Sequence, residues 1–288
     1  MYKMLARKPS TLSDAELDYF SEMYNSFDHK IRQFADEITE ELPSETASSQ
    51  VAAIAFSPND ALPKREARPT RRIAYLAEQL YLAQEDNDDH LAPLLKFTIL
   101  MQEYYDITDD IIDGDVAAGS EANVFLTLQY LMPALTKYLT RIGVNTTAYW
   151  SEQAIQMVDC FRDELVSEPS PEVYLDLLEK QALLYSTVTG LCGLISGGDA
   201  ALVNRYETIG NLYFKHEQLL LDGYQFGEES YPWNAWELLP EEEAMTLFKE
   251  LRTELNTALD ILPASRRKRV RPLISIDVST WAKQQLAD

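Results

Sequence analysis

Three aspartates, Asp109, Asp110 and Asp113, lie close together at the end of a long apolar run. Asp113 follows Asp109 by four residues and Asp110 by three, so a helix would place the carboxylates on one face, where they repel each other. A hard divalent cation would reverse that repulsion, and oxygen ligands at this density suit Mg²⁺. Since Mg²⁺ is usually held by one or two carboxylates together with substrate phosphates, the cluster predicts a magnesium site for a diphosphate.

An ordinary acidic surface is the alternative, because the chain has 47 Asp and Glu against 25 Lys and Arg and a formal net charge of -22. Most acidic clusters in such a chain are solvated surface. The neighbours of this cluster are apolar, however: Leu94, Leu95, Phe97, Ile99, Leu100 and Met101 precede it, and Ile107, Ile111 and Ile112 lie within it. This pattern is typical of a buried helix with acids at one end and favours the metal site.

The strong negative charge argues against nucleic acid or anionic lipid as a partner, because both would be repelled. It also suggests adaptation to high salt, where screening weakens self-repulsion. The chain has no run of eighteen apolar residues and no apolar signal core, so we expect a cytoplasmic protein without a transmembrane segment. Cys160 and Cys192, the only cysteines, are predicted to be core thiols.

Helical periodicity covers nearly the whole chain. The first helix is expected to begin with a capping box formed by Ser13 and Glu16 and to end before Pro43. Residues 44–63 are small, polar and proline-containing, and are predicted to be a loop. Further helices are predicted at 70–85, 89–113, 121–142 with a kink at Pro133, 146–166, 171 toward 190, 200–222, 240–262 and 265–286.

No segment predicts a β-strand. The chain has ten glycines, no Asn-Gly hairpin signal and no glycine-rich phosphate loop, which excludes the usual nucleotide-binding folds. A diphosphate must then be held by side chains, and an all-α bundle with carboxylates on facing inner helices is the architecture that fits. We therefore predict one all-helical domain over residues 1–288.

The segment Tyr104–Asp115 resembles the first aspartate-rich motif of the polyprenyl diphosphate synthases. Upstream, Lys64-Arg65-Glu66-Ala67-Arg68-Pro69 is similar to that family's Gly-Lys-Arg-x-Arg-Pro motif with one residue inserted. Downstream, Lys180-Gln181-Ala182 resembles its Lys-Thr-Ala segment, and Leu262–Ser265 looks like the start of its final helix. The resemblance implies an isoprenoid-synthase-type helical bundle around a central cavity.

The resemblance also implies an activity, the Mg²⁺-dependent condensation of isopentenyl diphosphate with an allylic diphosphate in isoprenoid biosynthesis. Asp109, Asp110 and Asp113 would be metal ligands, and Lys180 would contact the allylic diphosphate. The other candidates are Lys64, Arg65 and Arg68, which would bind the homoallylic diphosphate, and Tyr104 and Tyr105, which would make the product pocket shallow and the products short.

Each of these assignments has a plainer alternative. Lys180 also suits a solvated helix position, the basic residues of 64–69 suit a surface cluster, and Tyr104 and Tyr105 suit ordinary core packing. The family's second aspartate-rich motif should fall near Glu217, but this chain has only Glu217 and a displaced Asp222 there. Either could provide the second metal wall, although the neighbours of Glu217 also suit an exposed helix face.

Two further functions follow from these departures. The Arg-Arg-Gly sequence expected after the first motif is also absent. A noncatalytic or regulatory subunit that pairs with an active synthase would explain the survival of only one motif. Because members of the family pair through helices, the resemblance implies a homodimer or a heterodimer with a related synthase. A terpene cyclase shares the first motif but requires Asn-x-x-x-Ser/Thr-x-x-x-Glu, and the spacing from Asn204 and Thr208 leads to Leu212, which excludes it.

Overall fold

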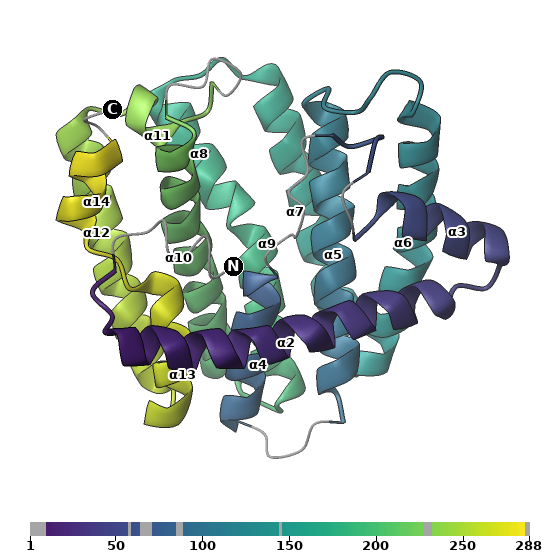
Figure 1. Ribbon diagram of the computed structural model, residues 1–288, viewed down its shortest axis with the longest axis horizontal. Coiled ribbons are helices and arrows are strands. Elements are labelled where there is room, and N and C mark those ends of the chain that lie inside the picture. Colours follow the sequence, from purple (N-terminus) through teal and green to yellow (C-terminus); the bar gives the residue numbers. More distant parts are fainter. Residues whose placement is uncertain are drawn as a thin grey trace. The chain divides into compact units, whose positions relative to one another are not determined.

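The computed structural model describes residues 10–56, 59–63, 71–84, 89–143, 146–226 and 232–285. These residues form α-helices and one short 3-10 helix (Figure 1). The described ranges contain no strand, and one isolated bridge joins Asn59 to Leu62. The all-α fold class predicted from the sequence is therefore confirmed.

The chain divides into two compact units. Unit 1 comprises Met1–Glu22, Gln79–Gln84 and Trp150–Asp288, and unit 2 comprises Met23–Glu78 and Glu85–Tyr149. The single domain expected over the whole chain stays a prediction. The boundary between the units falls within α2 (Asp14–Glu40), α4 (Arg72–Gln84) and α7 (Thr146–Val166).

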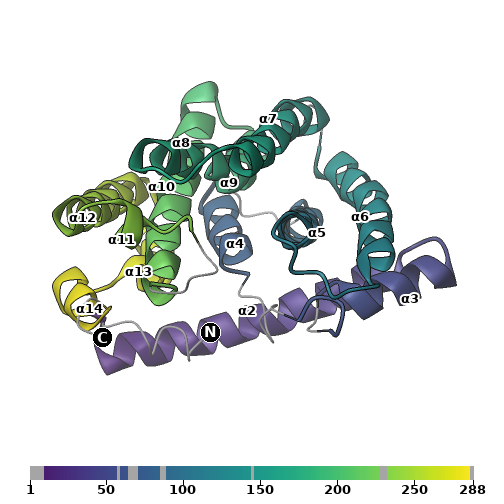
Figure 2. The same ribbon diagram turned by 90° about the horizontal axis from the view of Figure 1, so that it is seen from above.

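Unit 2 is built around α5 (Leu91–Ile112), which packs against α6 (Glu121–Ile142), while α3 (Glu45–Ile54) packs on α6 (Figures 1 and 2). The apolar run predicted to be buried is buried, with Leu94, Leu95, Phe97, Ile99, Leu100 and Met101 all shielded from solvent. Residues 94–101 are all buried, so this part of α5 is covered on all sides and belongs to the core. The helix carries the aspartates at its C-terminal end.

Unit 1 is organised around α10 (Ala200–Tyr224), which contacts α8 (Pro171–Gln181), α9 (Leu183–Ile195), α11 (Ala235–Leu238), α12 (Glu241–Ala258) and α14 (Val278–Gln285) (Figure 2). η1 (Leu259–Ile261) and α13 (Ala264–Ile274) follow α12. A Cβ at Gly210 would overlap the backbone carbonyl of Tyr185, so glycine at this position lets α9 and α10 approach closely.

Several predicted helix boundaries are confirmed. The predicted helices at 121–142 and 146–166 are α6 and α7. α2 begins with the expected capping box, in which the amide of Glu16 donates to Oγ of Ser13 at 3.4 Å and the amide of Ser13 donates to Oε2 of Glu16 at 3.0 Å. No helix in the described ranges is both long enough and apolar enough to cross a membrane.

The loop predicted at residues 44–63 is partly wrong, because α3 occupies Glu45–Ile54. Ser44 is its N-cap and accepts a hydrogen bond from the amide of Ala47 at 3.1 Å. Ala47, Val51 and Ile54 are buried, so α3 does have a helical apolar stripe. The small alanine and the surrounding serines made that stripe too weak to recognise.

Two long predicted helices are interrupted. The helix expected from 171 toward 190 is divided at Ala182 into α8 and α9. The helix expected at 265–286 is divided into α13 and α14, where Ser275 is extended and Asp277 caps the next helix by accepting from the amide of Thr280 at 3.1 Å. α11, a single turn, was not predicted at all.

Candidate functional site

The aspartate cluster lies at the C-terminal end of α5. Asp113 is the C-cap, and its amide donates to the carbonyl of Asp109 at 2.9 Å. Gly114 follows with φ +73°, a left-handed conformation that ends the helix. Asp109 and Asp113 are exposed and Asp110 is half-buried, whereas Ile107 is fully buried. The predicted arrangement, a core helix that presents carboxylates to solvent at one end, is therefore present.

A cation missed by the sequence analysis lies beside this helix. Arg71, immediately before α4, forms an ion pair with Glu103, and both side chains are buried, at 6% and 0% exposed. Its Nη1 atom also lies 3.5 Å from Oδ2 of Asp106. Asp106 precedes Asp109 and Asp110 by one helical turn, so Arg71 brings positive charge to the face that carries the cluster.

Glu103 has a second donor, because the amide of Phe56 donates to its Oε2 at 3.2 Å. The carboxylate thus links α5 to the segment after α3 and to the segment before α4. Glu103 is one of several polar residues between 94 and 107, so the sequence gives no distinct signal for this arrangement. Its partners are distant in sequence and could not be read from spacing.

Tyr104 and Tyr105 lie on α5 with their ring centroids 5.5 Å apart in an edge-to-face arrangement. Tyr105 is buried and Tyr104 is half-buried, and burial raises the pKa of both hydroxyl groups. Their assignment as residues that shorten the product pocket stays a prediction. Lys64, Arg65 and Arg68 lie outside the described residues.

Lys180, in the last turn of α8, is held by two carboxylates. Its Nζ atom lies 2.6 Å from Oδ2 of Asp163 on α7 and 2.7 Å from Oδ2 of Asp176, one turn earlier on α8. These hydrogen bonds raise the pKa of Lys180, with Asp163 the larger cause. The side chain is partly exposed, so a diphosphate could reach it by displacing these carboxylates.

Glu217, on α10, is buried, so the exposed helix face considered for it is wrong. Its Oε2 atom accepts a hydrogen bond from the hydroxyl of Tyr185 at 3.0 Å. The prediction of an exposed face was wrong because Lys215 and Gln218, which lie close to Glu217 in sequence, made the segment look solvated. Lys180 and Glu217 belong to unit 1 and the aspartate cluster to unit 2.

The carboxylate of Asp222 accepts hydrogen bonds from three groups of the protein itself. Its Oδ2 atom accepts from the hydroxyl of Tyr174 at 2.7 Å and from the amide of Ala235 at 2.8 Å, and its Oδ1 atom accepts from Gln218 at 2.8 Å. The side chain is fully buried, and burial raises its pKa to about 6. A carboxylate enclosed by three protein donors is a poor metal ligand, so Glu217 is the better candidate of the two.

This chain is similar to solved structures, but comparison by sequence found no match. No family model matches the sequence, and no curated protein resembles it in sequence. A geranyltranstransferase from Methanosarcina mazei matches with a TM-score of 0.69 at 14% identity, over 86% of this chain and 96% of that chain.

Two further solved structures agree. A geranylgeranyl pyrophosphate synthase from Corynebacterium glutamicum, complexed with calcium and isoprenyl diphosphate, matches with a TM-score of 0.69 at 13% identity, over 92% of this chain and 96% of that chain. A geranylgeranyl pyrophosphate synthetase from the archaeon Geoglobus acetivorans matches with a TM-score of 0.71 at 11% identity, over 92% and 98%. The chain has the polyprenyl synthase fold.

Within this polyprenyl synthase fold, the end of α5 has the ligand chemistry of a hard cation. The side chains of the three aspartates offer carboxylate oxygens, which Mg²⁺ prefers, and two of them, Asp109 and Asp113, are exposed to solvent. Across the described ranges, no group of three or more His, Cys, Asp or Glu side chains is arranged to hold a metal ion.

Proposed function

We propose that this protein is a Mg²⁺-dependent prenyltransferase that condenses isopentenyl diphosphate with an allylic diphosphate. One observation carries the proposal: Asp109, Asp110 and Asp113 lie at the open end of a buried helix in a chain with the polyprenyl synthase fold. The Corynebacterium glutamicum enzyme with this fold is complexed with calcium and isoprenyl diphosphate, which are the ligand classes expected here.

In this proposal the aspartates hold Mg²⁺, which would neutralise the diphosphate that leaves the allylic substrate. Arg71 holds Asp106 in place one turn before the cluster and offsets part of the negative charge on this face. Lys180 contacts the allylic diphosphate, with Asp163 and Asp176 holding its side chain until substrate displaces them. Tyr104 and Tyr105 occupy volume near the cluster, which favours short-chain products.

The test is a product assay in multimolar KCl with Mg²⁺, labelled isopentenyl diphosphate and allylic diphosphates from C5 to C15. We expect a product with the wild type and a loss of at least about 100-fold in Asp109→Asn, since metal clamps supply several kcal/mol to such reactions. Asp159→Asn, which neutralises an exposed acid on α7, is the matched control and should retain activity. Absence of product from every substrate pair with the wild type would contradict the proposal.

A noncatalytic subunit is the second candidate, and two observations favour it. The residues near the expected second motif are engaged within the protein, Glu217 by Tyr185 and Asp222 by three donors. In addition, α7 exposes an apolar set, each member at least 60% exposed: Ile155, Val158, Leu165 and Val166. Apolar side chains grouped in this way are commonly covered by a protein partner.

Co-purification with a competent synthase distinguishes the two candidates. If the protein is a regulatory subunit, it forms a stable complex and changes the product length of that synthase while making no product alone. Ile155→Glu together with Val158→Glu should then abolish the complex without unfolding the chain, because both positions are exposed. A wild-type protein that makes product by itself would contradict this second candidate.

A further inference from the structure

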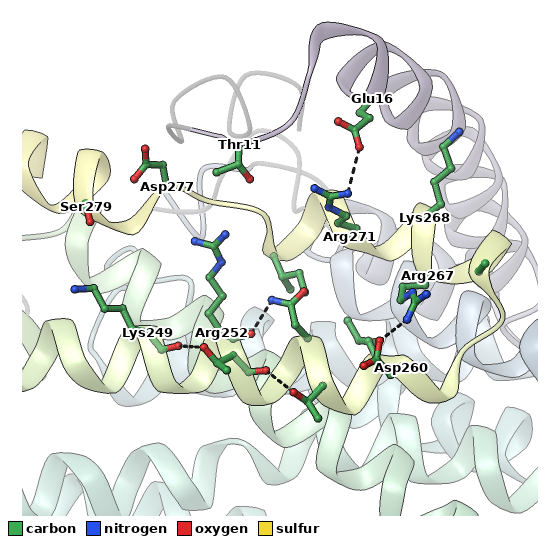
Figure 3. A pocket seen from close by; sticks show the side chains of 16 residues that line it. Thr11, Glu16, Lys249, Arg252, Asp260, Arg267, Lys268, Arg271, Asp277 and Ser279 are labelled. Atoms are coloured by element: carbon green, nitrogen blue, oxygen red, sulfur yellow. Dashed lines mark hydrogen bonds and ion pairs between the residues drawn. The ribbon is translucent and has the colours of Figure 1, made fainter.

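A groove in unit 1 concentrates positive charge. It has a volume of about 970 Å³ and lies among α12, α13 and the start of α14 (Figure 3). Five cationic side chains line it, Lys249, Arg252, Arg267, Lys268 and Arg271, against three acids, Glu16, Asp260 and Asp277. Because this lining carries two net positive charges and the whole chain -22, the rest of the chain carries -24.

The charge of this groove comes mainly from α13. Between Ala264 and Ile274 this helix has four arginines and one lysine and no acid. Like charges three and four residues apart on a helix repel each other. A run of this kind is therefore stabilised by nearby anions, whether these belong to the protein or to a ligand.

Two ion pairs of the cations that line this groove are solvent-exposed. Arg267 pairs with Asp260, and Nη1 of Arg271 lies 3.4 Å from Oε1 of Glu16, with the side chain of Arg271 53% exposed. Exposed pairs of this kind are weak and easily exchanged for another anion. Glu16 is also engaged by Ser13 in the capping box of α2, so Arg271 can leave it without leaving that carboxylate unpartnered.

The side of the groove formed by α12 provides two more cations. Arg252 is half-buried, donates to the carbonyl of Ile276, and rises from α12 toward the side where Asp277 lies (Figure 3). Lys249 is exposed one turn before it. Leu259 and Ile274 add buried apolar surface to the lining. The combination of cations from two helices with an apolar floor suits an organic anion better than a bare ion.

We propose that this groove binds a soluble small molecule that carries a diphosphate or longer phosphate group, held by Lys249, Arg252 and Arg271. Phosphate oxygens accept charge-assisted hydrogen bonds from such side chains. A small anion can enter the groove alone, whereas an extended polyanion such as nucleic acid or an anionic membrane would also meet the acidic remainder of the chain. The groove includes none of the residues of the proposed prenyltransferase site and needs no metal.

The experiment is titration calorimetry of the full chain with inorganic tripolyphosphate in EDTA, at the lowest KCl concentration at which the protein stays folded. EDTA removes binding at the aspartate cluster, which depends on Mg²⁺, so failure here and failure of the proposed function are separate results. We expect saturable binding by the wild type. Vesicles of phosphatidylcholine with phosphatidylglycerol, tested by co-sedimentation, should not bind.

Two variants locate the binding. Lys249→Gln with Arg271→Gln should weaken tripolyphosphate binding about tenfold or more. Arg162→Gln with Arg205→Gln removes the same charge from exposed positions on α7 and α10 and should change it less than about twofold. Lys249→Gln alone is the more conservative second variant and should show an intermediate loss. No saturable binding, equal losses in both double variants, or binding to vesicles in preference to tripolyphosphate would overturn the proposal.

Discussion

The hydroxyl of Tyr174 on α8 donates a 2.7 Å hydrogen bond to the buried carboxylate of Asp222 on α10. The same oxygen accepts from the amide of Ala235 at 2.8 Å, and the backbone carbonyl of Asp222 accepts from Nδ2 of Asn234 at 2.7 Å. Asp222 thereby fixes the start of α11 against α8 and α10. One residue that resembles a remnant of a metal motif is in fact the junction of three helices.

The buried carboxyl group of Asp222 predicts that the free energy of unfolding depends on pH. The pKa of Asp222 is raised from 3.8 to about 6, chiefly by burial, so between these values the native state holds a proton that the unfolded state releases. Stability from this group is therefore lost as pH rises from about 4 to about 6, by up to about 3 kcal/mol. The side chain of the Asp222→Asn variant does not titrate in this range, so this variant lacks the pH dependence. The free energy of unfolding of the wild type minus that of Asp222→Asn, from urea titrations, should fall across this window, and a constant difference would contradict the argument.

The ion pair between Arg71 and Glu103 gives a second prediction. Arg71→Met leaves Glu103 charged and buried, which should destabilise the protein by about 3–5 kcal/mol. Arg71→Met with Glu103→Leu removes both charges and should recover a large part of that loss. Chemical denaturation measures both. A loss below about 1 kcal/mol in the single variant would show that the pair is not buried as described.

A variant of Lys180 can distinguish contact with the substrate from a role in folding. If it binds the allylic diphosphate, Lys180→Gln should raise KM for that substrate about tenfold or more. The unfolding midpoint should hardly change, because the side chain is partly exposed and its two surface ion pairs contribute little to stability. Asp163→Asn with Asp176→Asn frees the lysine and should leave KM unchanged or lower. Arg205→Gln, on an exposed face of α10, serves as the control. An unchanged KM in Lys180→Gln would mean that Lys180 forms ion pairs within the protein and does not contact the substrate.

The charge of -22 predicts that salt stabilises the chain. Screening weakens the repulsion among its carboxylates, so the thermal unfolding midpoint should rise between low and multimolar KCl. Glu250→Gln with Glu254→Gln neutralises two exposed acids one turn apart on α12 and should reduce that rise. A midpoint that stays the same across this range of KCl would refute adaptation to high salt.

Local patterns account for the parts of the fold that the sequence predicted. α6 and α7 were predicted with the observed bounds because their apolar stripes are long, and the start of α2 because Ser13 and Glu16 form a capping box. The aspartate cluster was recognisable because its apolar surroundings made it unlike surface acid. α3 was missed because alanine and serine give a weak periodic signal.

The parts that could not be predicted depend on contacts distant in sequence. Arg71 meets Glu103 across 32 positions, and Tyr174 meets Asp222 across 48. Neither pair leaves a local pattern, so Glu103 was not recognised and Asp222 was interpreted as a displaced metal ligand. The basic groove likewise requires α2, α12 and α13 to come together before its residues become neighbours.

The packing of α10 also limits what protein engineering could do with this chain. Leu219, Leu220 and Asp222 are buried, within the stretch where the second aspartate-rich motif of a synthase would be expected. A complete Asp-Asp-x-x-Asp motif that ends at Asp222 needs aspartates at 218 and 219, and the one at 219 would replace a core leucine with a charge, at a cost of several kcal/mol. Asp222 would also have to leave its three donors within the protein. Introducing a complete second set of metal ligands would therefore require a redesigned interior around α10, and a few point substitutions would not be enough.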